Sequence, residues 1–142
     1  MSINRKEGLE SLAKLKDFIG PQQARVIRHY MMGEEGEHFA EKALELSLLV
    51  ETIPKIGETD GAGDAAVIQL HYFTAGADWW ITEIGKDGEA FGYVCIAGME
   101  DCAELGYISL PEVFENGAEI DLYWCCKTLS EIKAKIQRRR TA

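Results

Sequence analysis

Residues 65–96 read AAVIQLHYFTAGADWWITEIGKDGEAFGYVCI, and this stretch decides the fold. Side chains from Ala66 to Phe73 alternate with a period of two, which is the spacing of a β-strand with one buried face. We expect Ala66, Ile68, Leu70 and Tyr72 to point to one side of that strand and Val67, Gln69, His71 and Phe73 to the other. Turn signals at Thr74–Ala77 and Lys86–Gly88 predict hairpins into strands at Trp79–Glu83 and Ala90–Ile96.

The chain on either side completes an α+β fold. Two more strands are expected at Glu104–Ser109 and Glu119–Cys125, a helical turn at Leu110–Phe114 and a closing helix at Leu129–Ile136. Together these predict a five-stranded antiparallel sheet packed by helices.

About three helices are expected before the sheet. Leu9, Leu12, Leu15 and Ile19 recur at helical spacing, and Pro21 suits the first turn of a second helix that carries Ala24, Ile27 and Met31 inward and stops at Gly33. A third helix runs from a glutamate-rich first turn to Ile53, before Pro54, and its broad apolar face is expected to pack on the sheet. Residues 1–53 would form a helical segment and residues 54–142 a sheet domain, packed as one compact unit.

The formal net charge is −9, and it is unevenly distributed. Between Gly33 and Asp121 there are 20 acidic and 3 basic residues, whereas both ends of the chain are basic. One interpretation is that the basic ends dock on the acidic body. The other is that an acidic surface faces a basic partner, such as a nucleic-acid-binding protein. Direct binding of duplex DNA is disfavoured because the acidic body repels phosphates.

The four cysteines form no Cys-x-x-Cys pair, so we expect reduced, partly buried thiols and neither a zinc site nor a bound cofactor. The beginning of the chain lacks a signal-peptide pattern, and no apolar run has the length of a membrane span, so a cytoplasmic protein is expected.

Asp60-Gly61-Ala62-Gly63-Asp64 is expected to be a tight loop whose aspartates bond backbone amides. It lacks the Lys-Ser/Thr of a phosphate-binding loop and the further ligands of a calcium loop.

One catalytic hypothesis rests on polar residues at the predicted strand ends. His71, Glu83, Glu104 and Asp121, joined by Asp64, would have to converge as a metal site of the kind that cleaves phosphodiesters. The alternative is that each carboxylate satisfies backbone amides or pairs with a cation such as Lys127 or Arg25. We favour the second interpretation and lean against an enzyme.

Aromatic residues are dense in the sheet, a pattern that some proteins use to stack single-stranded bases. Binding of single strands usually needs lysine or arginine between the aromatic residues, and Lys86 is the only such residue between Lys55 and Lys127. Filling of the core is therefore the better interpretation of the aromatic residues. Trp79 and Trp80 point to opposite faces, and Trp80 is a candidate interface anchor.

Several short motifs follow one another in a fixed order between Pro54 and Ile132. They are Asp60-Gly61-x-Gly63-Asp64, Trp79 with Glu83, Phe91-Gly92-Tyr93, Glu104-Leu105-Gly106-Tyr107 and Asp121-Leu122-Tyr123-Trp124. This block resembles a domain-of-unknown-function family carried on proteobacterial plasmids, integrative elements and prophages. Where that family has proline before a lysine near its end, this chain has Cys126-Lys127. The resemblance implies a mobile-element accessory protein.

The functional expectation joins this context to the charge. It is a non-enzymatic inhibitor of a host defence complex, anti-CRISPR or anti-restriction, that uses an acidic surface against a basic nucleic-acid-handling partner; the alternative is a metal-dependent nuclease acting on single strands. Candidate partner-binding residues are Glu37, Glu41, Glu45, Glu58, Asp60, Asp64 and Trp80. Surplus apolar surface in residues 1–53 also predicts a homodimer.

Overall fold

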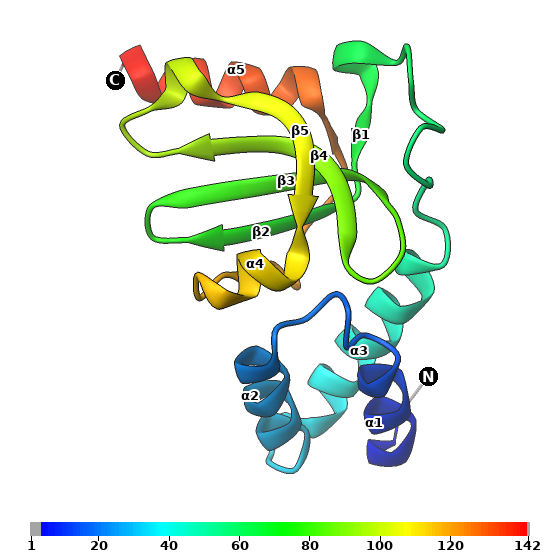
Figure 1. The fold of residues 1–142 in the computed structure, drawn as a ribbon. Coiled ribbons are helices and arrows are strands. Elements are labelled where there is room, and N and C mark those ends of the chain that lie inside the picture. Colours follow the sequence, from blue (N-terminus) through cyan, green and yellow to red (C-terminus); the bar gives the residue numbers. More distant parts are fainter. Residues whose placement is uncertain (1–3, 142) are drawn as a thin grey trace. The chain divides into compact units, whose positions relative to one another are not determined.

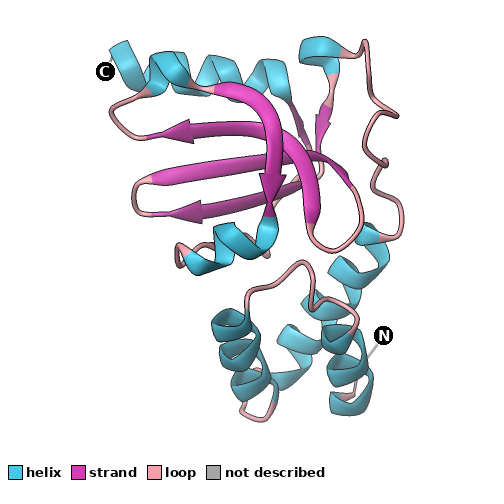
Figure 2. Cartoon of the chain, viewed as in Figure 1, coloured by secondary structure: helices cyan, strands magenta, loops and turns pink. Residues whose placement is uncertain are grey.

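The computed structural model describes residues 4–141 of the chain. They divide into two compact units, of which the first ends at Thr52 and the second begins at Ile53. We call them the helical unit and the sheet unit (Figures 1 and 2). The division lies one residue before the predicted boundary. No helix among the described residues has both the length and the apolarity needed to cross a bilayer.

The helical unit contains α1 (Arg5–Ala13), α2 (Pro21–Met31) and α3 (Gly36–Val50), which confirms the three predicted helices. Asn4 caps α1, because its side-chain oxygen accepts the Glu7 backbone N–H at 2.9 Å. The proline at the start of α2 lies in the first turn, as predicted.

Part of the apolar side of α3 is covered by helices of its own unit. Both α1 and α2 pack against α3. Gly8 permits the close approach of α1, since a Cβ atom at that position would lie 2.6 Å from the Ala40 Cβ. Ile27 and Met31 of α2 are buried, as predicted, and Ala24 is half-buried.

The sheet unit is built on a five-stranded antiparallel sheet in the order β5-β4-β3-β2-β6. Its strands are β2 (Leu70–Thr74), β3 (Ala77–Ile84), β4 (Glu89–Ile96), β5 (Glu104–Ser109) and β6 (Glu119–Ile120). The turn between β3 and β4 has positive φ angles at Asp87 (55°) and Gly88 (81°), which suits a tight hairpin. The α+β class and the five antiparallel strands are therefore as predicted.

Two of the predicted strands differ from the structure. The first is interrupted at Gln69, so that β1 (Val67–Ile68) precedes β2 and pairs with β7 (Lys127–Thr128) in a separate small sheet. The last ends at Ile120, because the Asp121 side chain accepts the Tyr123 backbone N–H at 2.9 Å and turns the chain away.

Short helices complete the sheet unit. The predicted helical turn is α4 (Leu110–Glu115), capped by Ser109, and the closing helix is α5 (Leu129–Thr141). Two 3₁₀ turns, η1 (Gly63–Ala65) and η2 (Glu100–Cys102), lie in the loops.

One part of the core of the sheet unit lies between α5 and one face of the sheet (Figure 1), while Tyr72 packs on Phe114 of α4. One buried cluster joins residues from β1, β3, β4 and α5, namely Ile68, Trp80, Tyr93, Cys95, Leu129, Ile132 and Ile136. The Trp124 indole N–H donates to the Ile68 carbonyl at 3.0 Å, which fixes the 121–126 loop to the same core.

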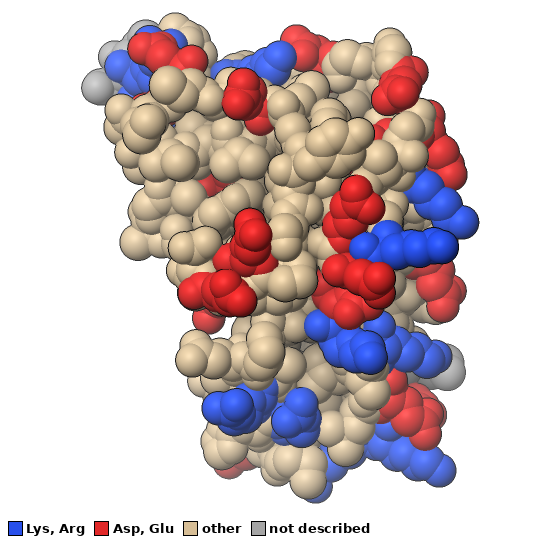
Figure 3. Space-filling view, in the orientation of Figure 1, with Lys and Arg blue, Asp and Glu red and all other residues tan. Residues whose placement is uncertain are grey.

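Charge reinforces the docking of α5. Lys133 pairs with Asp64 at 2.7 Å, Arg139 with Asp78 at 3.5 Å, and Arg140 with Asp101. At the C-terminal end, the interpretation that basic residues dock on the acidic body is thus confirmed. On the face seen in Figure 3, acidic groups are interspersed with wide uncharged areas.

Candidate functional site

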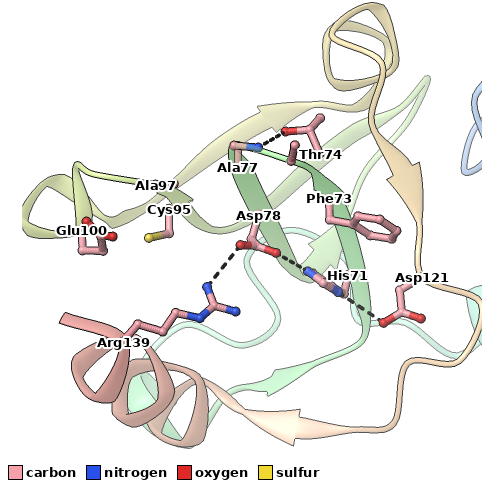
Figure 4. A pocket seen from close by; sticks show the side chains of 12 residues that line it. His71, Phe73, Thr74, Ala77, Asp78, Cys95, Ala97, Glu100, Asp121 and Arg139 are labelled. Atoms are coloured by element: carbon pink, nitrogen blue, oxygen red, sulfur yellow. Dashed lines mark hydrogen bonds and ion pairs between the residues drawn. The ribbon is translucent and has the colours of Figure 1, made fainter. Parts of the chain in front are cut away.

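A pocket of about 560 Å³ opens in the sheet unit beside the hairpin that joins β2 and β3. The residues of the Thr74–Ala77 turn line it together with several ionisable side chains (Figure 4). The ionisable groups among its lining residues are His71, Asp78, Cys95, Glu100, Asp121 and Arg139.

His71 lies at the centre of this group. Its Nε2 atom is 2.7 Å from Asp78 Oδ1, and its Nδ1 atom is 3.4 Å from Asp121 Oδ2. The ring also stacks on Trp80, with centroids 5.5 Å apart and planes inclined by 9°. Because each ring nitrogen faces a carboxylate and the ring is held by an aromatic neighbour, His71 is positioned to organise the pocket rather than to accept a substrate proton.

The hairpin register explains why these residues meet. Thr74 pairs with Ala77, so the connecting turn has only two residues, and His71 then pairs with Trp80. Asp78 lies two positions before Trp80 on the same side of the strand, a diagonal neighbour of His71. The early end of β6 brings Asp121 to the other ring nitrogen, since its backbone N–H donates to the His71 carbonyl at 2.8 Å.

Asp78 links the hairpin to α5. One of its carboxylate oxygens faces His71 and the other faces Arg139. Burial raises the pKa of the Asp78 carboxyl, but the hydrogen bond and charge of His71 together with the Arg139 guanidinium outweigh burial, so this pKa lies below its usual value. Asp78 is therefore a carboxylate at neutral pH.

The opposite wall of the pocket carries Cys95 and Glu100. The thiol is buried, and burial, helped by the negative charges of Glu100 and Asp78, raises its pKa. A protonated thiol is a poor nucleophile. Glu100 accepts the Gly98 backbone N–H at 3.1 Å, which lowers its pKa and keeps a third negative charge at the pocket.

Of the four residues in the catalytic hypothesis, only His71 and Asp121 meet. Glu83 is buried elsewhere, where it accepts backbone N–H groups from Gly57 at 3.2 Å and Thr59 at 2.6 Å and the Thr59 hydroxyl at 2.5 Å. Burial raises its pKa, but these hydrogen bonds outweigh burial and lower it. Glu83 thus satisfies backbone amides, as the structural alternative predicted.

Glu104 and Asp64 also lie outside the pocket. Glu104 is exposed at the start of β5, and Asp64 pairs with Lys133. Among residues 4–141, no three His, Cys, Asp or Glu side chains are grouped so as to hold a metal ion. The convergence that the catalytic hypothesis requires, which we did not favour, is therefore absent among these residues, because Glu83 is bonded by the loop before β1 and Asp64 by Lys133 of α5. We expected the aspartates of the Asp60–Asp64 loop to bond backbone amides. The amides of Gly57 and Thr59 are instead bonded by Glu83.

The predicted partner-binding residues have different environments. Trp80 is 1% exposed and belongs to the core, so its selection as an interface anchor is corrected. Glu58 and Asp60 are exposed on the loop before η1, while Glu37 and Glu45 are exposed on α3 and Glu41 is half-buried. Glu45 also pairs with Lys42 at 3.4 Å.

Sequence reasoning did not select Asp78, Glu100 or Arg139. A signal for Asp78 was present, because a two-residue turn at Ala75-Gly76 fixes its diagonal position to His71. Arg139 had no such signal, since its approach depends on where α5 docks.

Comparison with known proteins gave no relative of this chain: no family model, no curated protein and no solved structure matches it.

Proposed function

We propose that this protein acts by binding, and that its pocket receives an arginine or lysine side chain of a basic protein partner. The observation that carries the proposal is the charge of the pocket, where the carboxylates of Asp78, Glu100 and Asp121 outnumber its two basic groups, His71 and Arg139. A cation entering this concave site would gain attraction from all three carboxylates.

The rest of the sheet unit supports the same kind of partner. Three cations of α5 are paired internally, whereas Glu58, Asp60 and other exposed carboxylates remain on the surface. Such a surface attracts basic proteins and repels free nucleic acid. His71 and Glu83 are held by partners within the protein, and burial raises the pKa of the Cys95 thiol, so none of them is poised for chemistry.

The partner class follows from the resemblance of residues 54–132 to mobile-element proteins. A basic nucleic-acid-handling complex of host defence, a CRISPR effector or a restriction enzyme, presents the arginine and lysine residues that such a pocket would take. In this proposal the protein is an anti-defence inhibitor that competes with nucleic acid for those residues.

The test is a binding and inhibition assay with purified CRISPR effectors and restriction enzymes. We expect inhibition of DNA cleavage by at least one of them, and an association rate that falls as salt is raised. Glu100→Gln should weaken binding several-fold, and Glu115→Gln, which removes one exposed charge on α4, should leave it unchanged. Equal affinities for both variants, or binding without salt dependence, would overturn the placement at the pocket.

A parallel experiment examines the acidic row of α3. Reversal of Glu37, Glu41 and Glu45 to lysine should preserve folding, because Glu37 and Glu45 are exposed on α3 and Glu41 is only half-buried. Slower association in this variant alone would move the contact from the pocket to the helical unit.

A further inference from the structure

We propose that the free edge of β5 is a docking site for an extended segment of the same basic partner, which adds to the sheet as a further strand. This inference rests on the proposed function for the class of partner, and on separate observations for the place and mode of binding.

The first observation is the backbone of β5. The strand pairs with β4, and among the described residues no strand pairs with its other edge. The Leu110 N–H donates to the Gly88 carbonyl at 2.9 Å beside the Glu89–Ser109 pair, which fixes the hydrogen-bonding phase of the ladder. In this phase Glu104, Gly106 and Ile108 bond to β4, whereas the N–H and C=O groups of Leu105 and Tyr107 point away from it.

The second observation is the surface beside this edge. Tyr107 is 73% exposed and Leu105 is 40% exposed. A groove of about 250 Å³ is lined by Glu104, Gly106 and Tyr107 of this strand together with Val94, Ile96, Met99 and Cys102. Gly106 keeps the groove open, because no atom lies within 4 Å of the place where its Cβ would be. Alternate side chains of an added strand would enter this groove.

The third observation is charge. Glu104 lines the groove, and Glu100 and Asp101 lie in the adjacent η2 turn. Exposed edges are commonly protected by lysine, proline or a bulge, but residues 104–109 contain neither lysine nor proline and pair with β4 without a register shift. An occupant that carries arginine or lysine between apolar residues is thus favoured over a second copy of this acidic chain.

The groove and the pocket share one loop. Ala97 and Glu100 line the pocket, while Met99 and Cys102 of the same segment line the groove. A segment bound along β5 would therefore lie near the pocket that takes the cationic side chain.

The test uses the intact protein and a short synthetic peptide that alternates arginine with valine. Amide hydrogen exchange should slow at Leu105 and Tyr107 when the peptide is added, with little change at Glu104 and Gly106, which already bond to β4. The same peptide with alternate N-methylated amides should bind about tenfold more weakly, because it cannot pair with the edge.

Matched variants separate backbone from side chain. Tyr107→Ala keeps the N–H, whereas Tyr107→Pro removes an outward donor that the fold does not use. We expect Tyr107→Pro to bind the peptide about tenfold more weakly than Tyr107→Ala, with both variants folded by circular dichroism.

Equal affinity of the two variants and unchanged exchange at Leu105 and Tyr107 would overturn the edge proposal. Salt-dependent binding that is still weakened by Glu100→Gln would then leave the proposed function standing. Protection of these two amides that grows with protein concentration in the absence of peptide would identify a second copy as the occupant and would also overturn the proposal.

Discussion

At the scale of single residues, the carboxylate of Glu83 holds a whole loop against β3 by hydrogen bonds. It lies near the end of β3 and is 2% exposed, yet its oxygens are used by two backbone amides and one hydroxyl of the loop that begins at Pro54. The adjacent segment follows β3 as well, since Ile56 donates to the Ile84 carbonyl at 3.1 Å. The Glu83 side chain thus extends the attachment of this loop to β3 beyond the backbone bridge between Lys55 and Ile84.

We predict that Glu83→Gln lowers the free energy of unfolding by about 1.5–3 kcal/mol, because the charge-assisted bonds to Gly57 and Thr59 are weakened and an amide N–H₂ meets backbone donors. Urea denaturation of the purified protein measures this. Glu58→Gln, an exposed carboxylate on the same loop, is the control and should change stability by less than about 0.5 kcal/mol. Equal effects of the two substitutions would contradict the role assigned to Glu83.

The depressed pKa values of Asp78 and Glu83 predict acid sensitivity. A carboxyl group whose pKa is lower in the folded state stabilises the fold above its unfolded pKa, and this contribution is lost as the pH falls through the folded value. The stability of the protein should therefore decline below about pH 4. Asp78→Asn should flatten part of that decline, and an unchanged pH profile in this variant would show that Asp78 does not contribute to it.

At the scale of elements, α5 is held by two kinds of contact with different strengths. Leu129, Ile132 and Ile136 are buried in the core of the sheet unit, whereas Lys133 makes its ion pair to Asp64 at the exposed surface. Burial of apolar area is worth more than an exposed ion pair.

We predict that Ile132→Ala costs about 2–5 kcal/mol of stability and Lys133→Ala at most about 1 kcal/mol. Denaturant titrations of both variants at low and high salt separate the contributions, since only the ion pair is screened. A larger loss for Lys133→Ala would mean that charge is the main force docking α5.

The close contact between α1 and α3 should reverse the usual effect of replacing a helical glycine by alanine. Alanine in place of glycine normally stabilises a helix interior by up to about 1 kcal/mol. At Gly8 the added methyl group would meet Ala40, so we predict that Gly8→Ala destabilises the helical unit. Thermal unfolding followed by circular dichroism at about 222 nm, where helices have a minimum, measures the loss of stability. The double variant Gly8→Ala with Ala40→Gly should recover part of it, and no recovery would contradict a direct clash.

At the scale of the whole molecule, the homodimer remains a prediction. Val26, Tyr30, Met32 and Leu48 are exposed apolar residues of the helical unit, and surfaces of this kind are commonly covered by a partner. Light scattering across a dilution series should give twice the monomer mass, and Leu48→Glu should reduce it. Deletion of residues 1–32 should lower solubility while the sheet keeps its strand signature. A monomer mass at every concentration would show the prediction to be wrong.

Local sequence patterns predicted most of the fold. The features that they did not predict depend on contacts between residues that are distant in the sequence. Alternation from Ala66 to Tyr72 correctly predicted which residues are buried. It did not predict that they face two sides of the sheet, where Ile68 joins Trp80 and α5 while Tyr72 packs on Phe114 of α4. It did not predict the break at Gln69, since β1 pairs with residues about 60 positions away. The candidate site shows the same division: His71 and Asp121 were selected as polar residues at strand ends, but Arg139 reaches the pocket only through the tertiary docking of α5.

The stacking of His71 on Trp80 gives the protein an intrinsic optical probe. An indole sealed from solvent emits at shorter wavelength than an exposed one, and its emission responds to the neighbour on its face. Trp80 contacts the ring that connects Asp78 and Asp121, so a cation that enters the pocket and shifts this ring should alter the fluorescence of Trp80 without any label. Occupancy of the pocket could then be followed in real time, with Trp79 replaced by phenylalanine to remove its contribution to the signal.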